Sequence, residues 1–350
     1  MWGKAPADEL ELSPRMGGIA LKNGLILVSE RNWAAAIREA DGAIRVASGK
    51  KVRLPGSGES GQGGQGAVPG GAAGERVGGA QRHGAAGGAP AMSAGAADAA
   101  PGALAGPAGR AAPYKPMGVP VVRGLERFAE TILVLGTVKR YLPNARLPLE
   151  GGRVMAALTA SLAATSAVRA FAPKSAFVQE AGAALATFLP AVLALKGSAI
   201  SGYHGAEHKV IGGRETALRA AAEGGAQPGD AEHTIITGDS AAATKEHDRC
   251  GSNIVAPYLL ATVATNLLAR GRSGMKTPAA SAVASAASLG LALEALRWAS
   301  RHGDNILAKL MMSPGRIIQK KLTTSEPTSD QLEVGERALT ELMRVEMAGA

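Results

Sequence analysis

Two histidines and a glutamate in the segment 203–209 have the spacing of a metal site. His204 and His208 lie four residues apart, and Glu207 stands between them. In a helix this spacing puts both imidazoles on one face, about one turn apart, where they can bind one ion. The order His-x-x-Glu-His matches that of one class of zinc peptidases, in which the acid activates a metal-bound water. The pattern predicts a divalent metal site, with zinc the expected ion and Glu207 the general base.

His247 and Cys250 are candidates for further ligands, and the number of ligands decides the kind of site. Their His-x-x-Cys spacing lets one turn present a nitrogen and a sulfur to the same ion. If both bind together with His204 and His208, the ion is fully coordinated by protein and the site is structural. If only three protein ligands bind, an open position holds a water whose pKa falls to about 7, and Glu207 serves as its base. A Cys250 nucleophile activated by His247 is a separate enzyme hypothesis.

A carboxylate farther along the chain is an alternative third ligand. Glu294 stands inside an apolar stretch, where an acid is costly unless it pairs, binds metal or faces water. The competing interpretation is an ion pair with Arg297 or Arg301 at the end of the same helix. Both interpretations remain open at the level of the sequence.

The composition limits the classes of protein that this chain can represent. Its 350 residues carry a formal charge of +9, and they include a single cysteine, which excludes an intramolecular disulfide framework. The basic balance suits nucleic acid, an anionic membrane or a soluble surface. No helix-turn-helix, zinc-finger spacing or aromatic-interleaved basic strand is recognisable, so no nucleic-acid partner is predicted. The amino terminus lacks the apolar run of a secretory signal.

The first part of the chain divides into three predicted units. Residues 1–54 are expected to form a small β-rich unit in which Asp41-Gly42 marks a hairpin turn. Residues 55–113 consist mainly of Gly, Ala, Ser, Pro and Gln, so they cannot bury a core and are predicted to be a disordered insertion. Residues 114–153 hold a predicted amphipathic helix and a linker.

The amphipathic helix is predicted from Val121 to Tyr141. Apolar residues recur there at steps of three and four, with basic residues between them. The predicted apolar face consists of Leu125, Phe128, Ile132, Leu135 and Val138. A basic helix of this kind either lies on a membrane surface or packs in a globular domain with its charged face in solvent.

Apolar stretches within residues 154–301 favour a mainly α, multi-pass membrane protein with about four membrane helices and the lipid bilayer as its partner. The stretches are Val154 to Phe171, Ala176 to Tyr203, Ile254 to Ala269 and Ala279 to Ser300. Two of them are long enough to cross roughly 30 Å of hydrocarbon. Because they contain more Ala, Ser, Thr and Gly than Leu and Ile, a buried soluble bundle is the alternative.

Basic residues cluster before the first stretch, between the second and third, and after the fourth. By the positive-inside rule, both termini and a His/Cys loop at 204–253 lie in the cytoplasm, or in the stroma if the membrane is that of a chloroplast. The predicted localisation is therefore a plasma or organellar membrane.

The carboxy-terminal segment 302–350 is predicted to end in a docking helix. Thr328 and Gln331 fit a capping box. The helix after them carries one apolar face, composed of Leu332, Leu339, Leu342 and Met343. Such a face is expected to pack on the rest of the protein.

Several motifs together resemble the YqhQ-like family of uncharacterised integral membrane proteins, often labelled predicted metal-dependent enzymes. The resemblance rests on the segment 203–209, on His247-x-Arg249-Cys250-Gly251-Ser252, and on Pro314-Gly315, Gln319 and Leu322-Thr323-Thr324 near the end. It implies membrane insertion and a site formed by His204, Glu207, His208, His247, Cys250 and Glu294. The amino-terminal motif departs from the family pattern, and the block 55–113 is extra.

Two functions follow as hypotheses. The first is a metal-dependent hydrolase whose zinc-type site lies at the membrane–cytoplasm interface, with Glu207 as general base. The second is a non-enzymatic membrane assembly or regulatory protein in which a closed metal site only shapes the loop.

Overall fold

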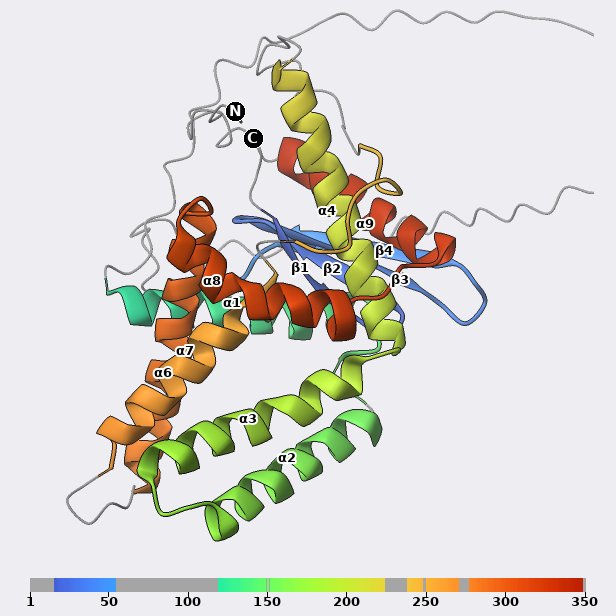
Figure 1. Ribbon diagram of the computed structural model, residues 1–350. Helices are drawn as coiled ribbons and strands as arrows, with labels where there is room; N and C mark the ends of the chain where they lie inside the picture. The colour runs from blue at the N-terminus through green and yellow to red at the C-terminus, as the bar shows by residue number, and fades with distance from the viewer. Residues whose placement is uncertain are drawn as a thin grey trace, which may run out of the picture.

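The computed structural model describes residues 16–54, 119–148, 150, 152–223, 238–247, 250–270 and 277–348. The predicted insertion at 55–113 lies outside these residues. In Figure 1 the sheet and the helices beside it occupy the upper part of the molecule, and a group of further helices forms the lower part.

The predicted amino-terminal β unit is confirmed as an antiparallel sheet. Its strands, in the spatial order β1-β2-β3-β4, are β1 (Gly17–Ala20), β2 (Gly24–Val28), β3 (Asn32–Arg38) and β4 (Ile44–Lys50). The predicted turn at Asp41-Gly42 joins β3 to β4, and Gly42 has a φ of +85°, which glycine adopts without steric cost. The apolar run before it folds into two strands because the chain reverses between Ala20 and Gly24.

Helices cover both faces of this sheet, so β2 is buried along its whole length. Leu25 and Leu27 pack against α4 (Ala199–Glu223) and α9 (Ser329–Ala348) on one face. Ile26 and Val28 point to the other face, where α1 (Pro120–Tyr141) contributes Val134 and Val138. The alternation of strand side chains thus produces two apolar cores.

The helix predicted from Val121 to Tyr141 is present as α1, but its buried face differs from the predicted one. Val138 is buried, whereas Phe128 and Ile132 are 42% and 47% exposed. The buried face carries Gly124 and Glu130 instead. Gly124 lies against the backbone of Gly290, and Glu130 pairs with Lys51, so these contacts set the rotation of the helix. Phe128 and Ile132 therefore face outward, while Leu135 packs at the edge of the core.

The apolar stretches form α2 (Gly152–Phe171), α3 (Ala176–Leu195), α6 (Val255–Leu268) and α7 (Pro278–Arg301). Among the described residues α2, α3 and α7 are long and apolar enough to cross a membrane. Only 6% of the most apolar part of α2 is buried within the protein, so almost all of this helix faces outward. With 14 residues, α6 reaches about 21 Å, so four spans are not confirmed.

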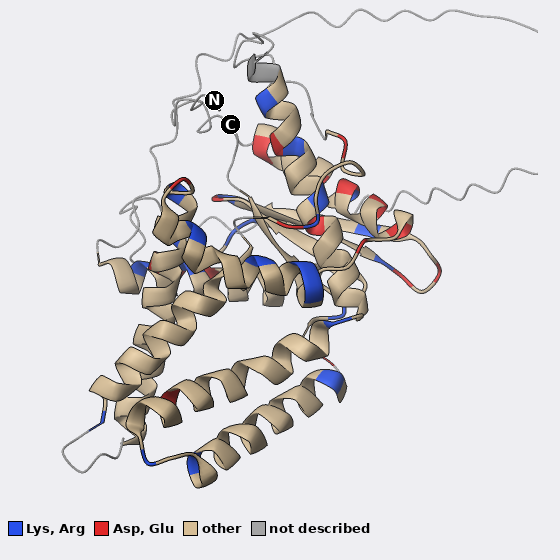
Figure 2. Ribbon diagram, in the orientation of Figure 1, with Lys and Arg blue, Asp and Glu red and all other residues tan. Residues whose placement is uncertain are grey.

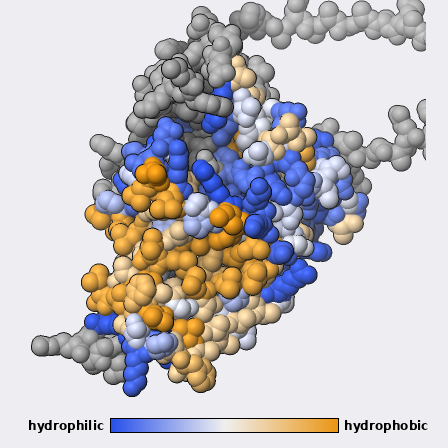
Figure 3. All heavy atoms as spheres, viewed as in Figure 1, coloured by the Kyte–Doolittle hydropathy of each residue, from blue (hydrophilic) through white to orange (hydrophobic). Residues whose placement is uncertain are grey.

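The second predicted stretch, Ala176 to Tyr203, is not one helix. Its first part forms α3, which ends at Leu195, and the chain then turns at Gly197, whose φ is +65°. The histidine pair therefore lies on a separate helix, α4. Charged residues gather around the sheet, α4 and α9 and are sparse along the lower helices (Figure 2), while the face shown in Figure 3 is hydrophobic over those helices. This division makes a membrane location plausible.

The carboxy-terminal part consists of α8 (Ile306–Ile318), a π-helical turn η3 (Gln319–Thr323) that continues it, and α9. The predicted capping box is present, since Thr328 and Gln331 exchange hydrogen bonds between their side chains and backbone N–H groups. Leu339, Leu342 and Met343 are buried beside the sheet. The last helix is therefore packed on the β unit, as its apolar face predicted.

Candidate metal centre

A helix positions both histidines of the segment 203–209, as the spacing predicted. His204 and His208 project from neighbouring turns of α4, and their ring centroids lie 4.5 Å apart. The prediction of a loop at 204–253 is wrong for residues 204–223, because these residues belong to α4. The rigid helix fixes the separation of the two rings.

Backbone carbonyls orient the two imidazoles. The Nδ1 atom of His204 is 3.0 Å from the Thr323 carbonyl oxygen, and that of His208 is 2.6 Å from the Lys245 carbonyl oxygen. A carbonyl only accepts hydrogen bonds, so each Nδ1 carries a proton, and in the neutral ring Nε2 is then the nitrogen that holds the lone pair. The Nε2 atom of His208 is buried with no hydrogen-bond partner among the described residues. A buried nitrogen in this state fits a metal ligand.

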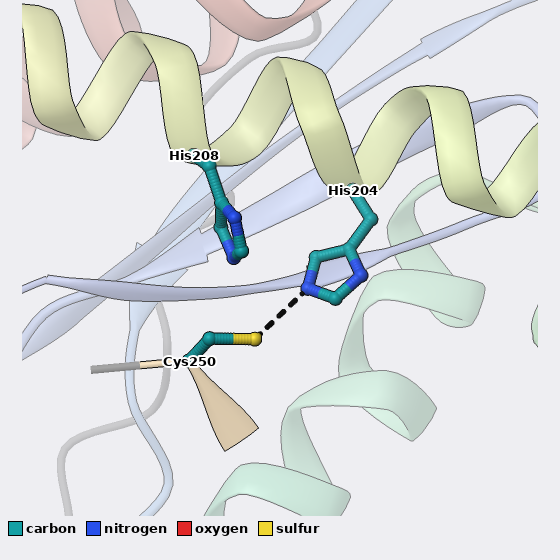
Figure 4. A group of neighbouring side chains, drawn as sticks. All are labelled: His204, His208 and Cys250. Carbon is teal, nitrogen blue, oxygen red and sulfur yellow. Dashed lines mark hydrogen bonds between the residues drawn. The ribbon is translucent and has the colours of Figure 1, made fainter. Parts of the chain in front are cut away.

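Cys250 adds a sulfur to these two nitrogens. Its Sγ lies 3.1 Å from Nε2 of His204, and the hydroxyl of Ser252 donates to it at 3.2 Å. Figure 4 shows both rings pointing from α4 toward the thiol. One ligand atom from each of the three side chains lies within 4.8 Å of the others. Two imidazoles and a thiol form a donor set that suits zinc, so these residues fit the predicted ion.

Cys250 stands at the start of a short helical turn, η2 (Gly251–Ile254), which runs directly into α6. The Sγ atom accepts a hydrogen bond from the backbone N–H of Ser252 as well as from its hydroxyl. These two hydrogen bonds fix the position of the sulfur, the atom through which cysteine binds metal. The imidazole that the Cys250 Sγ contacts is that of His204, whereas the hydrogen bond between Cys250 and His247, the base of the nucleophile hypothesis, joins backbone atoms.

His247 lies beside the cluster but is directed to another partner. Its ring centroid is 5.8 Å from that of His208, and its Nε2 is 3.4 Å from a carboxylate oxygen of Glu215. The structure therefore brings His204, His208 and Cys250 together and keeps His247 next to them.

The turn η3 holds the segment around His247 in place. The side-chain oxygen of Gln319 accepts from the backbone N–H of His247 at 3.0 Å, and its amide nitrogen donates to Asn253 at 2.9 Å. Asn253 in turn donates to the His247 carbonyl at 3.3 Å. The same turn supplies the Thr323 carbonyl that orients His204. Two segments far apart in sequence are thus locked against α4.

These supporting residues were not identified from the sequence. Gln319 and Thr323 fall within the motifs quoted for the family resemblance, which was the available signal for them. Lys245 and Thr323 contribute through their backbone carbonyls, and a residue of any type has such a carbonyl. Residue types alone therefore did not mark them.

Glu207 faces the first strand of the sheet. It is 6% exposed, and its carboxylate accepts a hydrogen bond from the backbone N–H of Gly18. Burial raises the pKa of Glu207, and this effect outweighs the lowering effects of the nearby His204 and His247 and of the Gly18 N–H. A buried carboxyl with a raised pKa can take up and release a proton closer to neutral pH than an exposed one.

The cluster opens into a cavity of about 430 Å³. Its lining comes from the start of β1, the segment after β4, α1, α4 and the region of Cys250. His204, Glu207, His208, His247 and Cys250 all border it. Space for a small molecule is therefore directly beside the three candidate ligands.

Glu294 is placed away from this cavity. It lies on α7, and its two carboxylate oxygens bind the guanidinium of Arg123 at 3.0 and 2.6 Å. A second ion-pair contact, to Arg297, measures 3.9 Å. The structure thus contains an ion pair of Glu294 with Arg297, one of the two partners considered from the sequence, although Arg123 on α1 is the closer one.

Residues 196–345 match a family of proteins of unknown function, DUF1385. The matched part includes α4, the cluster and the η3 turn, and it leaves out the sheet and the first two helices. No curated protein and no solved structure shows significant similarity to the chain. The match agrees with the expectation of an uncharacterised family over this part of the chain, and it carries no activity with it.

Proposed function

We propose that this is an integral membrane protein that binds a divalent ion of the zinc class through His204, His208 and Cys250 and uses it for hydrolysis. The observation that carries the proposal is the orientation of the two imidazoles. Backbone carbonyls accept hydrogen bonds from both Nδ1–H groups, so in the neutral rings both Nε2 lone pairs are available beside the Cys250 sulfur. Three protein ligands leave a coordination position for a substrate or water, as in catalytic zinc sites.

Each residue of the proposed site has a separate task. When bound, the ion supplies a Lewis acid that polarises a substrate oxygen and acidifies water. Glu207 accepts the proton released by the attacking water and passes it to the leaving group, which its raised pKa favours. The Gly18 N–H holds the Glu207 carboxylate at the cavity wall. Burial keeps bulk water from competing for that carboxylate.

The test is metal analysis of the full chain purified in detergent, together with hydrolysis of a panel of nitrophenyl esters and phosphates. We expect one zinc-class ion per chain, lost in His204→Ala and in His208→Ala. Glu207→Gln should keep the ion and lower hydrolysis by about 100-fold or more, the usual contribution of a general base. A metal-free wild-type protein, or full hydrolysis by Glu207→Gln, would contradict the proposal.

One observation favours the competing function, a closed structural site in a non-enzymatic assembly or regulatory protein. His247 borders the same cavity, with its ring 5.8 Å from that of His208. If it left Glu215 and turned toward the ion, four protein ligands would exclude water. Glu207 would then serve only as a neighbouring acid.

For the membrane arrangement, we infer four crossings in two hairpins, α2 with α3 and α6 with α7. The support is that α6 is apolar and packs beside α7, as α2 packs beside α3. Four crossings put both termini and the metal site on one side, which the basic residues assign to the cytoplasm or stroma. In a Cys250→Ser background, Lys174→Cys between α2 and α3 should label from the side opposite to Asp41→Cys. Labelling of both from one side would contradict this topology.

A further inference from the structure

The cavity beside the metal cluster is lined by basic residues on the side of α1. Three basic residues border it there, Lys51 and Arg53 after β4 and Arg127 on α1. The cluster comes from α4 and from Cys250, so basic groups and metal ligands belong to different elements around one space. A ligand in this cavity would meet both.

An ion pair fixes the position of this basic segment. Lys51 is 3.2 Å from the Glu130 carboxylate, and the two side chains are only 10% and 4% exposed. Glu130 also accepts a hydrogen bond from the backbone N–H of Leu54. These contacts attach residues 51–54 to α1 and hold Arg53, which lies between them, at the border of the cavity.

A bound ion makes the charge around the cavity favour an anion. The lining holds three bases, Lys51, Arg53 and Arg127, and three acids, Glu30, Glu130 and Glu207. Of these, Lys51 and Glu130 form an ion pair. A divalent ion on the cluster would add two positive charges to this balanced lining.

We propose that this cavity binds a phosphate group of the substrate, with Arg53 and Arg127 on one side of it and the metal cluster on the other. This inference rests on the proposed metal-dependent function. Guanidinium groups pair with phosphate through parallel N–H···O bonds. A phosphate monoester offers three terminal oxygens to two guanidiniums and an ion, whereas a carboxylate offers only two. The cavity volume of about 430 Å³ leaves room for such a group and part of its ester.

The phosphate group can belong to a soluble ester or to a lipid. The outer face of α1 exposes Phe128 and Ile132, and its inner side borders the cavity through Arg127 and Glu130. One helix thus has an apolar outer surface and a charged inner one. A phospholipid headgroup and a water-soluble phosphate ester share the chemistry that this cavity recognises.

The test uses the metal-loaded full chain in a maltoside detergent, which contains no phosphate. Inorganic phosphate, glycerol 3-phosphate and dioctanoyl phosphatidic acid are titrated separately by calorimetry. We expect all three to bind, with Arg53→Gln and Arg127→Gln each weakening binding about tenfold or more, as the loss of a hydrogen bond to a charged group implies. Arg45→Gln is the matched control, because Arg45 lies on β4 and pairs with Glu39 outside the cavity. Its binding should equal that of the wild type.

Metal content measured on the same samples separates the two proposals. If every variant holds its ion and the wild type binds none of the three phosphates, the phosphate proposal is overturned and the metal site stands. If the wild-type protein binds phosphate but metal analysis finds no ion in it even after loading, the proposed metal-dependent function fails instead. Tighter binding of the phosphatidic acid than of glycerol 3-phosphate identifies a lipid source, and equal binding identifies a soluble one. Unchanged phosphate binding in both arginine variants also overturns the assignment.

Discussion

Gly18 of β1 approaches the Glu207 side chain of α4 so closely that a Cβ at position 18 would lie 2.6 Å from the Glu207 carboxyl carbon. Glycine is therefore required at this position if the carboxylate is to stay where it is. The neighbouring Gly17 has nothing within 4 Å of its own Cβ position. The pair provides a substitution that moves the proposed base without touching a metal ligand.

We expect Gly18→Ala to fold and to keep its metal, because the crowded group is the end of a flexible side chain. Displacement of the Glu207 carboxylate should lower hydrolysis by about 10-fold to 100-fold, the usual effect of a misplacement near 1 Å. Metal content and hydrolysis rate are measured side by side. Gly17→Ala is the control and should match the wild type, while full activity in Gly18→Ala would contradict the role of Glu207.

His247→Ala distinguishes the open site from the closed one. With three ligands, the variant keeps its ion, since Nε2 of His247 is bound to Glu215. His302→Ala, which removes an imidazole stacked on Trp298, is the matched control. Elemental analysis of both variants decides the matter. Loss of the ion in His247→Ala alone would favour the structural site.

Gln319→Leu should weaken metal binding, although within the described part of the chain the Gln319 side chain hydrogen-bonds to His247 and Asn253 and to none of the three ligands. The substitution leaves the His247 N–H and the Asn253 side-chain oxygen without their buried partner. The segment that ends at Cys250 then loses its fixed position, and the dissociation constant of the ion should rise about 10-fold to 100-fold. A chelator competition measures this change. Lys320→Gln, one residue farther on an exposed position, should have no effect, and equal constants for both variants would contradict the prediction.

Glu294→Gln tests the carboxylate that the sequence offered as a ligand. Because Glu294 pairs with Arg123, we expect full metal content and a loss of stability of about 1 kcal/mol in the contact between α1 and α7. Arg123→Gln should have the same effect, and the double variant should be no worse than either single one. Thermal unfolding of the three variants measures the coupling. A loss of metal in Glu294→Gln would return Glu294 to the ligand set.

The contact between α9 and β4 predicts a pH dependence of stability. Hydrogen bonds from Arg344, with a smaller contribution from Ser48, lower the pKa of Glu341 below 4.5, the value of an unperturbed glutamate. A carboxyl whose folded pKa is lowered stabilises the protein above its unfolded pKa and loses that contribution as the pH falls through the folded value. Glu341→Gln should therefore lower the unfolding temperature at pH 7 and have little effect well below pH 4.

Ser48→Ala should reproduce part of that pH-dependent loss, because the Ser48 hydroxyl donates to the same carboxylate. Unfolding temperatures of both variants across this pH range form the measurement. A difference between Glu341→Gln and the wild type that is constant at all pH values would contradict the assignment.

Much of the local structure was predictable from the sequence. The spacing of His204 and His208 predicted one helical face, the Asp41-Gly42 pair predicted its hairpin, and Thr328 with Gln331 predicted the start of α9. These predictions succeeded because they depend on the period of the backbone and on contacts between residues a few positions apart. The same reasoning predicted the apolar helices. It did not predict that three of these described helices, rather than four, have the length and composition of a membrane span.

Only the tertiary structure decided which residues meet. Cys250 contacts His204, which lies 46 positions away in sequence, and the Thr323 carbonyl orients His204 from 119 positions away. Arg123 forms an ion pair with Glu294 at a separation of 171 positions. The rotation of α1, which turned Phe128 outward, followed from its contacts with Gly290 and Lys51. The physical reason is that local propensity determines what each segment forms, whereas the partner of each face depends on the packing of all segments together. The sequence by itself thus determined the candidate ligands and the helix that carries two of them, and the fold determined the set that converges.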